Sequence, residues 1–77
     1  MEVLQGKVYR HKADHKYLVL HLVHDSTNET EGNQGVVYVS LDNGSINYRD
    51  LAEFVEVVVW PDGVKRPRFV LESEIAI

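Results

Sequence analysis

The sequence predicts an all-β protein: a small SH3-like barrel of about five short strands with one helical turn, with residues 1–77 forming that single domain. Two patterns predict this class. Short stretches of alternating apolar and polar residues have the period of two that is typical of β-strands. Glycine, asparagine, aspartate and proline mark tight turns between these stretches. Because 77 residues can build only one small core, we expect the strands to bend and close on themselves.

The first half of the chain contains two expected strands. Residues 6–11 alternate around Val8 and Tyr9, and residues 13–15 form a turn. Residues 16–23 form a strongly apolar second strand, which a polar loop over residues 24–34 follows. We expect the second strand to place Leu18, Leu20 and Leu22 on one face and Tyr17, Val19, His21 and Val23 on the other.

A hairpin and a helical turn follow. Residues 36–41 are β-branched and predict the third strand, and residues 45–48 predict its returning partner. The intervening Asp42-Asn43-Gly44 predicts a type I′ turn, which needs positive φ at both central residues. Residues 49–54 lack alternation and suit one helical turn, with Leu51 and Phe54 pointing inward.

The last two strands flank a proline-glycine turn. Residues 54–60 predict a strand and Pro61-Asp62-Gly63 a turn, and residues 65–70 predict a short final strand. Pro67 has no N–H to donate, so the final strand should lie at a sheet edge. The strand over 54–60 should place Val55, Val57 and Val59 on one face and Phe54, Glu56, Val58 and Trp60 on the other.

Two strands that we expect to be central, over residues 18–22 and 55–60, are apolar on both faces. Only one face of each strand can contact the core of so short a chain. The other face must be covered by the chain's tail, by a ligand or by a second copy. We expect a homo-oligomer, because small cores usually need such additional support.

Composition limits the possible functions. Eight Lys and Arg against twelve Asp and Glu give a net charge of -4, which makes nucleic acid an unattractive partner. Basic residues nevertheless gather within residues 7–16, where a small anion could bind. The absence of cysteine excludes disulfides, thiolate zinc sites and cysteine nucleophiles. We see no signal peptide and no apolar run near the ~20 residues of a spanning helix, so we expect no membrane partner and a location in the cytoplasm of a bacterium or of a phage's host.

Several segments carry a resemblance to a known family. They are, in order, Gly6-Lys7-Val8-Tyr9-Arg10-His11-Lys12, Tyr17-Leu18-Val19-Leu20, Val36-Val37-Tyr38, Tyr48-Arg49 with Leu51 and Phe54, and Gly63 followed by Pro67-Arg68-Phe69. Over about residues 6–69 the chain resembles the bacterial and phage domain-of-unknown-function family 1653. The resemblance implies a small SH3-like barrel and no established activity. Such families travel in phage genomes as small early proteins, which favours a role in the contest between host and virus.

The chain also departs from the family pattern. Asn47 stands where the family has tryptophan, and Asp50 stands where it has proline. The loop that begins at residues 23–26 is several residues longer and ends near Gly32. These departures indicate that one rim of the barrel is altered in this member.

Six residues are candidate ligand-binding residues: Arg10, His11, Tyr48, Arg49, Trp60 and Arg68. The arginines could bind a phosphate or carboxylate, and the aromatic rings could stack on a base. Alternatively, the arginines form structural ion pairs with Glu53, Glu56 or Glu72, and the aromatics pack in the core or in an interface. Arg10 and His11 are adjacent on a strand, so their side chains should point to opposite faces.

The sequence does not favour catalysis or metal binding. His21 lies on an apolar face and is expected to be a buried, hydrogen-bonded ring. His21 and His24 cannot ligate one ion from a continuous strand, and no carboxylate pattern completes a tetrahedral set. His24, Asp25 and Ser26 are adjacent, whereas a catalytic triad is a spatial arrangement. We expect no enzyme activity, no metal and no cofactor.

These observations predict a non-enzymatic binding protein. The specific hypothesis is a homo-oligomeric, phage-type protein that sequesters a small nucleotide-like signalling ligand of host defence at a subunit interface. The alternative is a monomeric adaptor or inhibitor that binds a host protein or peptide in an aromatic groove.

Overall fold

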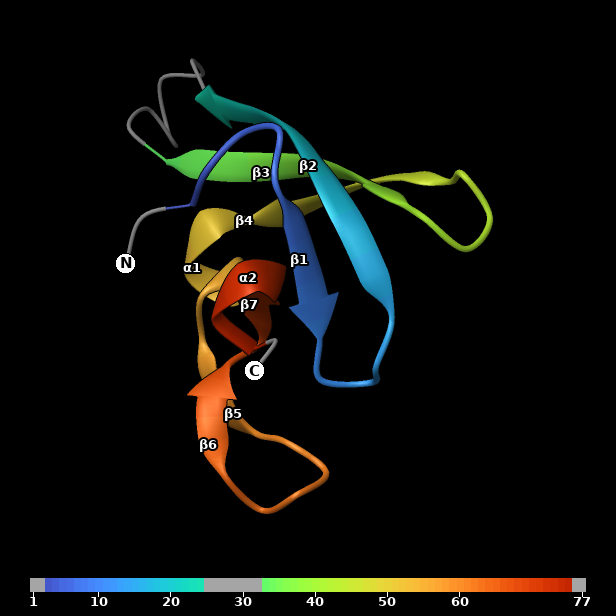
Figure 1. The fold of residues 1–77 in the computed structure, drawn as a ribbon. Coiled ribbons are helices and arrows are strands. Elements are labelled where there is room, and N and C mark those ends of the chain that lie inside the picture. Colours follow the sequence, from blue (N-terminus) through green and yellow to red (C-terminus); the bar gives the residue numbers. More distant parts are fainter. Residues whose placement is uncertain (1–2, 25–32, 76–77) are drawn as a thin grey trace.

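The computed structural model describes residues 3–24 and 33–75. The described residues form seven strands and two short helices: β1 (Val8–His11), β2 (Lys16–His24), β3 (Gln34–Ser40), β4 (Ile46–Asp50), α1 (Leu51–Phe54), β5 (Val57–Val59), β6 (Lys65–Pro67), β7 (Phe69–Leu71) and α2 (Glu72–Ile75). The predicted all-β, barrel-like class is confirmed (Figure 1). The structure has more strands than the predicted number of about five, in part because the predicted strand over 65–70 is divided at Arg68 into β6 and β7. The Arg68 N–H does not take part in strand pairing and donates to the Glu56 carbonyl at 2.7 Å. Helix α2 was not predicted.

The strands form one curved antiparallel sheet and one separate hairpin. The five-stranded sheet has the order β4-β3-β2-β1-β7, and β5 pairs with β6 alone. Figure 1 shows this hairpin projecting below the sheet. The prediction that residues 55–60 form a central strand is therefore wrong, because β5 covers Val57–Val59 and has β6 as its one neighbour. Phe54, the first residue of the predicted strand over 54–60, belongs to helix α1. Val57 and Val59 are 61% and 55% exposed, whereas Trp60 is buried. Pro67 lies in β6, which is an edge strand as predicted.

The core lies on the inner face of the five-stranded sheet, against which helix α1 packs Phe54. Phe54 and Phe69 stack in parallel, with their ring centroids 4.0 Å apart, and Leu51 packs against the same cluster. The inward orientation predicted for Leu51 and Phe54 is thus confirmed. The buried core residues are Val3, Tyr9, Val19, Val36, Tyr38, Phe54 and Phe69.

A β-bulge in β2 changes which side chains face the core. Val19 pairs with Tyr38 and His21 pairs with Val37, so Leu20 is an extra residue between them. Both Leu20 and His21 therefore oppose Val37 on the outer face, where a regular strand would have turned His21 inward. The prediction that His21 is a buried ring is wrong: the residue is exposed.

The β3–β4 hairpin occurs where it was predicted, but with a different turn. Residues 41–44 form the loop, which is closed by the Ser40 N–H donating to the Ser45 carbonyl at 2.9 Å. Gly44 has a φ of 75°, but Asn43 does not have positive φ. The type I′ prediction is therefore wrong. The longer loop removes the need for two consecutive left-handed residues, and the Asn43 side chain stabilises it by accepting the Ser45 N–H at 2.9 Å.

Candidate functional site

The inner face of the sheet carries a cluster of aromatic rings around Phe69. Strand β7 places Phe69 opposite His11 of β1, and these two ring centroids are 4.8 Å apart. Tyr17 of β2 and Tyr38 of β3 meet the Phe69 ring in edge-to-face geometry, with centroid distances of 5.6 and 5.3 Å. Tyr38 is buried, whereas His11 and Tyr17 are half-buried and reach the surface.

Arg49 of β4 lies over this aromatic cluster. Its Cζ is 5.5 Å from the centroid of Phe69, within cation–π range, and its Nε donates to the Tyr38 hydroxyl at 3.3 Å. Among the residues that the structure describes, no carboxylate pairs with the Arg49 guanidinium. No carboxylate of the described residues therefore competes with an anionic ligand for its two terminal nitrogens. We call His11, Tyr17, Tyr38, Arg49 and Phe69 the His11–Arg49 cluster.

The His11 ring is fixed by the β1–β2 turn. Its Nδ1 accepts the N–H of Ala13 at 3.1 Å, so the neutral ring carries its proton on Nε2 and can donate from there. Burial lowers the pKa of His11 below its ordinary value, and the positive charges of Arg49, Arg68 and Lys12 lower this pKa further. The same cations create a positive potential that would attract an anion.

Arg68 contributes to this potential but is already bound within the protein. Its Nε donates to the Glu53 carbonyl at 3.1 Å, and its Nη2 donates to Glu56 Oε1 at 2.7 Å. The structure thus pairs Arg68 with one of the acids that the ion-pair alternative named. Within residues 3–24 and 33–75, Arg49 is the arginine of this region without a carboxylate partner.

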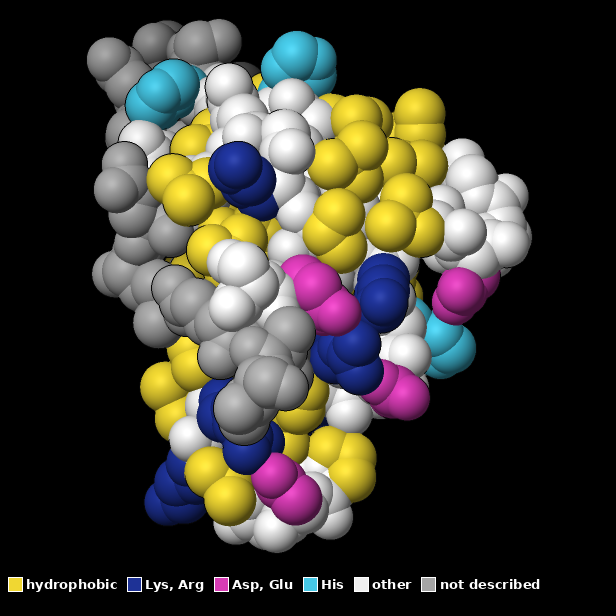
Figure 2. Space-filling view, in the orientation of Figure 1, with side chains coloured by type: hydrophobic (Ala, Val, Ile, Leu, Met, Phe, Trp, Pro, Cys, Tyr) yellow, Lys and Arg dark blue, Asp and Glu magenta, His cyan; other side chains and the backbone are white. Residues whose placement is uncertain are grey.

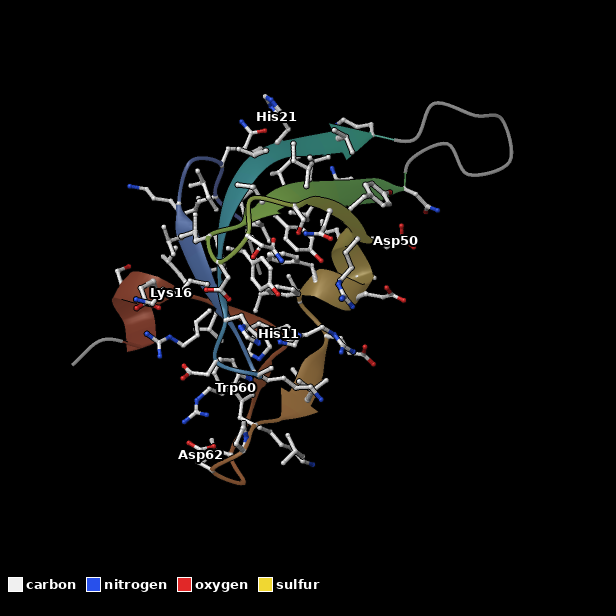
Figure 3. All side chains as sticks on the ribbon, turned by 90° about the vertical axis from the view of Figure 1, so that its right-hand side faces the viewer. His11, Lys16, His21, Asp50, Trp60 and Asp62 are labelled. Carbon is white, nitrogen blue, oxygen red and sulfur yellow. The ribbon has the colours of Figure 1, made fainter. Side chains whose placement is uncertain are left out.

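A second concave region separates the β1–β2 turn from the β5–β6 hairpin. This groove has a volume of about 360 Å³. Figure 3 shows Trp60 and Asp62 at the hairpin end of the molecule, beyond His11. Trp60 donates its indole N–H to the Pro67 carbonyl at 2.9 Å and is 8% exposed, so it lines the groove without offering an open stacking face. The groove is lined by Arg10, Lys12, Asp14, Trp60, Pro61, Asp62 and Arg66.

Ion pairs hold two of the groove's cations. Arg10 donates to both oxygens of Glu72 at 2.8 and 3.0 Å and also to Asp14 at 2.7 Å. Arg66 makes two bonds to Asp62, and these bonds lower the pKa of Asp62 to about 2. The Lys12 amine has no acidic partner within the described ranges, so it is the cation of the groove with free donors.

The six predicted site residues therefore divide among three places. His11 and Arg49 share the inner face, with Arg68 nearby, whereas Arg10 and Trp60 line the groove. Tyr48 lies on the outer face of the sheet, because it pairs with Val37, and its hydroxyl donates to Asp50 at 3.1 Å. Arg10 and His11 point to opposite faces, as alternation predicted.

The six candidates left out several residues of these sites: Tyr17, Tyr38 and Phe69 of the cluster, and Asp62 and Arg66 of the groove. Lys12 of the groove lies in the basic stretch 7–16, where an anion site was expected. A signal for the two tyrosines was present: Tyr17 lies on the same face of its strand as Val19, and Tyr38 lies opposite Val19 on the neighbouring strand. Phe69 and the groove depend on how distant strands meet, and no local pattern carries that signal.

The structure gives no support to a metal centre in the part of the chain that it describes. Residues 3–24 and 33–75 contain no group of three or more His, Asp or Glu side chains that could hold an ion. His15 is bound to Asp42, with Nδ1 and Oδ2 2.8 Å apart. Asp25 and Ser26 lie outside the described residues. No described helix has the length and apolar character needed to span a bilayer.

The geometry defines a class: a small β-barrel domain with a cationic, aromatic inner face. The family described as "Protein of unknown function (DUF1653)" matches residues 7–71, and the chain belongs to this family. A crystal structure of a DUF1653 protein from Bordetella bronchiseptica is similar, with a TM-score of 0.68 and 31% identity over 87% of this chain and 85% of that one. No curated protein matches the chain.

Proposed function

We propose that this protein is a non-enzymatic binding protein that holds a small anionic ligand at the His11–Arg49 cluster. The observation that carries the proposal is the half-buried Arg49 guanidinium, which stacks over Phe69 and has no carboxylate partner among the described residues. Arginine is suited to phosphate and carboxylate because its planar donors bind two oxygens at once. His11 Nε2 would add a donor, and the half-buried Tyr17 ring would add an aromatic surface.

A nucleotide-like ligand fits this combination of charge and aromatic surface. In the finer form of the proposal, the protein is cytoplasmic and of phage type, and it removes a nucleotide signal of host defence. That form draws its support from the family resemblance. Tyr48 would not contribute to this site from the same chain, because Arg49 and Tyr48 lie on opposite faces of β4.

Native mass spectrometry and calorimetry test this proposal. A co-purified small mass would identify the ligand class directly. Calorimetric titration with inorganic phosphate, adenosine monophosphate and cyclic dinucleotides would then compare the wild type with Arg49→Gln. A hydrogen bond to a charged group contributes about 1.5–3 kcal/mol, so we expect roughly ten- to hundred-fold weaker binding.

Lys65→Gln is the matched control, because it removes one positive charge from the exposed side of the β5–β6 hairpin. It should leave the affinity nearly unchanged. Equal binding by wild type and Arg49→Gln, or no binding of any of these anions by the wild type, would refute the proposal.

A second candidate function is supported by the groove beside Trp60. An adaptor or inhibitor could bind an extended acidic segment of a host protein there, with Trp60 and Pro61 as an apolar floor. Lys12, which has no acidic partner among the described residues, would supply the positive charge. Affinity capture from a bacterial lysate should then recover a stoichiometric partner with wild type and with Lys65→Glu, but not with Lys12→Glu. Capture that is insensitive to Lys12→Glu would exclude the groove.

A further inference from the structure

The outer face of the five-stranded sheet is crossed by an uninterrupted apolar row. The register pairs Val8 with Leu18, Leu18 with Val39, and Val39 with Ile46, so one residue from each of β1, β2, β3 and β4 lies in this row. A sheet face exposed to water usually carries polar side chains. The row contains no polar residue.

Leu20 and Val37 extend this row on the same face of the sheet. The bulge in β2 adds Leu20 opposite Val37, so the irregularity that turns His21 outward also enlarges the apolar surface. Ile46, on the edge strand β4, is 68% exposed. We call Val8, Leu18, Leu20, Val37, Val39 and Ile46 the outer apolar face.

Charged side chains of both signs border this face. In the next row of the sheet, Arg10 pairs with Lys16, and both contact Glu72, with nitrogen–oxygen distances of 2.8 and 3.4 Å. Arg10 also pairs with Asp14. Figure 2 shows a hydrophobic patch with basic and acidic side chains along its lower border. An apolar centre with a polar rim is the usual anatomy of a protein–protein contact surface.

The size of the face suits a small interface between two copies of the chain. Strands β1 to β4 have 4, 9, 7 and 5 residues, and these 25 residues, at about 3.3 Å each on strands about 4.8 Å apart, cover a footprint of roughly 400 Å² before corrugation is counted. Stable interfaces bury about 800 Å² per partner, so the relief of the side chains and the charged rim must supply about half of the required area.

The rim favours an identical partner. A two-fold axis brings the same surface of both subunits together, and a rim with both signs can then set acids opposite bases. A partner of a single charge sign would gain no such complementarity. A chain of this length also has a small core, which self-association would supplement.

We infer that two copies of this chain form a two-fold dimer in which their outer apolar faces pack against each other. This inference is independent of the proposed ligand site, because His11 and Arg49 lie on the inner face and stay accessible in such a dimer. Arg49→Gln should therefore leave the dimer intact, and loss of the dimer should leave ligand affinity unchanged.

Sedimentation velocity across a wide concentration range tests the inference, with circular dichroism as a check on folding. We expect the wild type to be a dimer and Ile46→Lys to be at least ten-fold weaker in self-association. Val57→Lys is the matched control, because Val57 is 61% exposed but lies on the β5–β6 hairpin. It should remain a dimer.

A second variant separates face packing from edge pairing. Leu18 lies on β2, inside the sheet, so Leu18→Gln should weaken a face-packed dimer but not one joined through the edges of β4. A monomeric wild type would overturn the inference. So would a dimer that survives Ile46→Lys, a folded Leu18→Gln variant that dimerises normally, or dissociation by Val57→Lys alone.

Discussion

Tyr48 and Arg49 are neighbours in the sequence, yet they serve opposite faces of β4. Arg49 lies over the inner aromatic cluster, whereas the ring of Tyr48 lies over Gly35 of β3 on the outer face. A Cβ at Gly35 would overlap the far end of the Tyr48 ring. Glycine here leaves space for a cross-strand aromatic ring, which covers backbone that would otherwise be open.

This contact predicts the effect of Gly35→Ala. The new methyl group must displace the Tyr48 ring, and since the overlapping atoms are at the end of a long side chain, we expect a loss of about 1 kcal/mol, the low end of overpacking costs. In a Tyr48→Ala background, the same substitution should be neutral or stabilising, because alanine lowers the entropy of the unfolded chain. Urea denaturation of the four proteins in the cycle measures the coupling. Additive effects would show that the ring does not occupy this position.

His11 predicts a pH dependence of stability. Burial and neighbouring cations lower its pKa in the folded state, so the unfolded chain binds the proton more readily. The free energy of unfolding should therefore fall as the pH drops from 6.5 towards the folded-state pKa. His11→Asn keeps an acceptor for the Ala13 N–H and should lose this slope in urea denaturation on either side of 6.5. His21→Asn, at an exposed position, should retain the wild-type slope; loss of the slope in both variants would contradict the assignment.

At the scale of secondary-structure elements, the sequence predicted those that depend on local backbone preferences. Turn chemistry and alternation located β1, β2, the β3–β4 hairpin, α1 and the Pro61–Gly63 turn, because these depend on local backbone preferences. The bulge at Leu20 could not be predicted, because it depends on register with β3 and no residue in β2 marks it. The errors about His21 and its face follow directly from that bulge.

The candidate site was predicted less completely than the fold. The sequence identified His11 and Arg49, but not that they would meet at Phe69, since this contact needs β7 to pair with β1. It also grouped Tyr48 and Trp60 with them, although Tyr48 lies on the outer face and Trp60 is buried at the groove. Residue types indicated which side chains could bind an anion, while tertiary pairing decides which of them lie together.

The β1–β2 turn supports a prediction at the scale of an element. Asp14 has a φ of 67° and is the non-glycine residue with positive φ among those described. Asp14→Ala and Asp14→Gly both remove the carboxylate that pairs with Arg10, but only glycine adopts this backbone conformation without steric cost. We expect the alanine variant to be about 1 kcal/mol less stable than the glycine variant in chemical denaturation. Equal stabilities would mean that the turn rearranges when the side chain is lost.

In the whole molecule, the ends of the described chain are joined where β7 pairs with β1. Arg10 on β1 and Glu72 at the start of α2 reinforce this pairing with two hydrogen bonds, and the two side chains are 27% and 25% exposed. The Arg10 guanidinium holds the pKa of Glu72 below its ordinary value of 4.5, and Lys16 acts in the same direction. The bond therefore contributes stability above pH 4.5, which is lost as the pH falls through the folded-state pKa.

Glu72→Gln tests whether this pair holds β7 against β1. At neutral pH the variant should unfold at a lower urea concentration than the wild type, and the two curves should converge once acid protonates Glu72 in the wild type. Because Leu71 directly precedes Glu72, its amide, which lies opposite Tyr9, should also exchange faster with deuterium. Glu53→Gln, at an exposed position on α1, provides the control and should change neither quantity. If Glu72→Gln and Glu53→Gln behave alike at neutral pH, backbone pairing and the Phe54–Phe69 stack hold β7 against β1 without this ion pair.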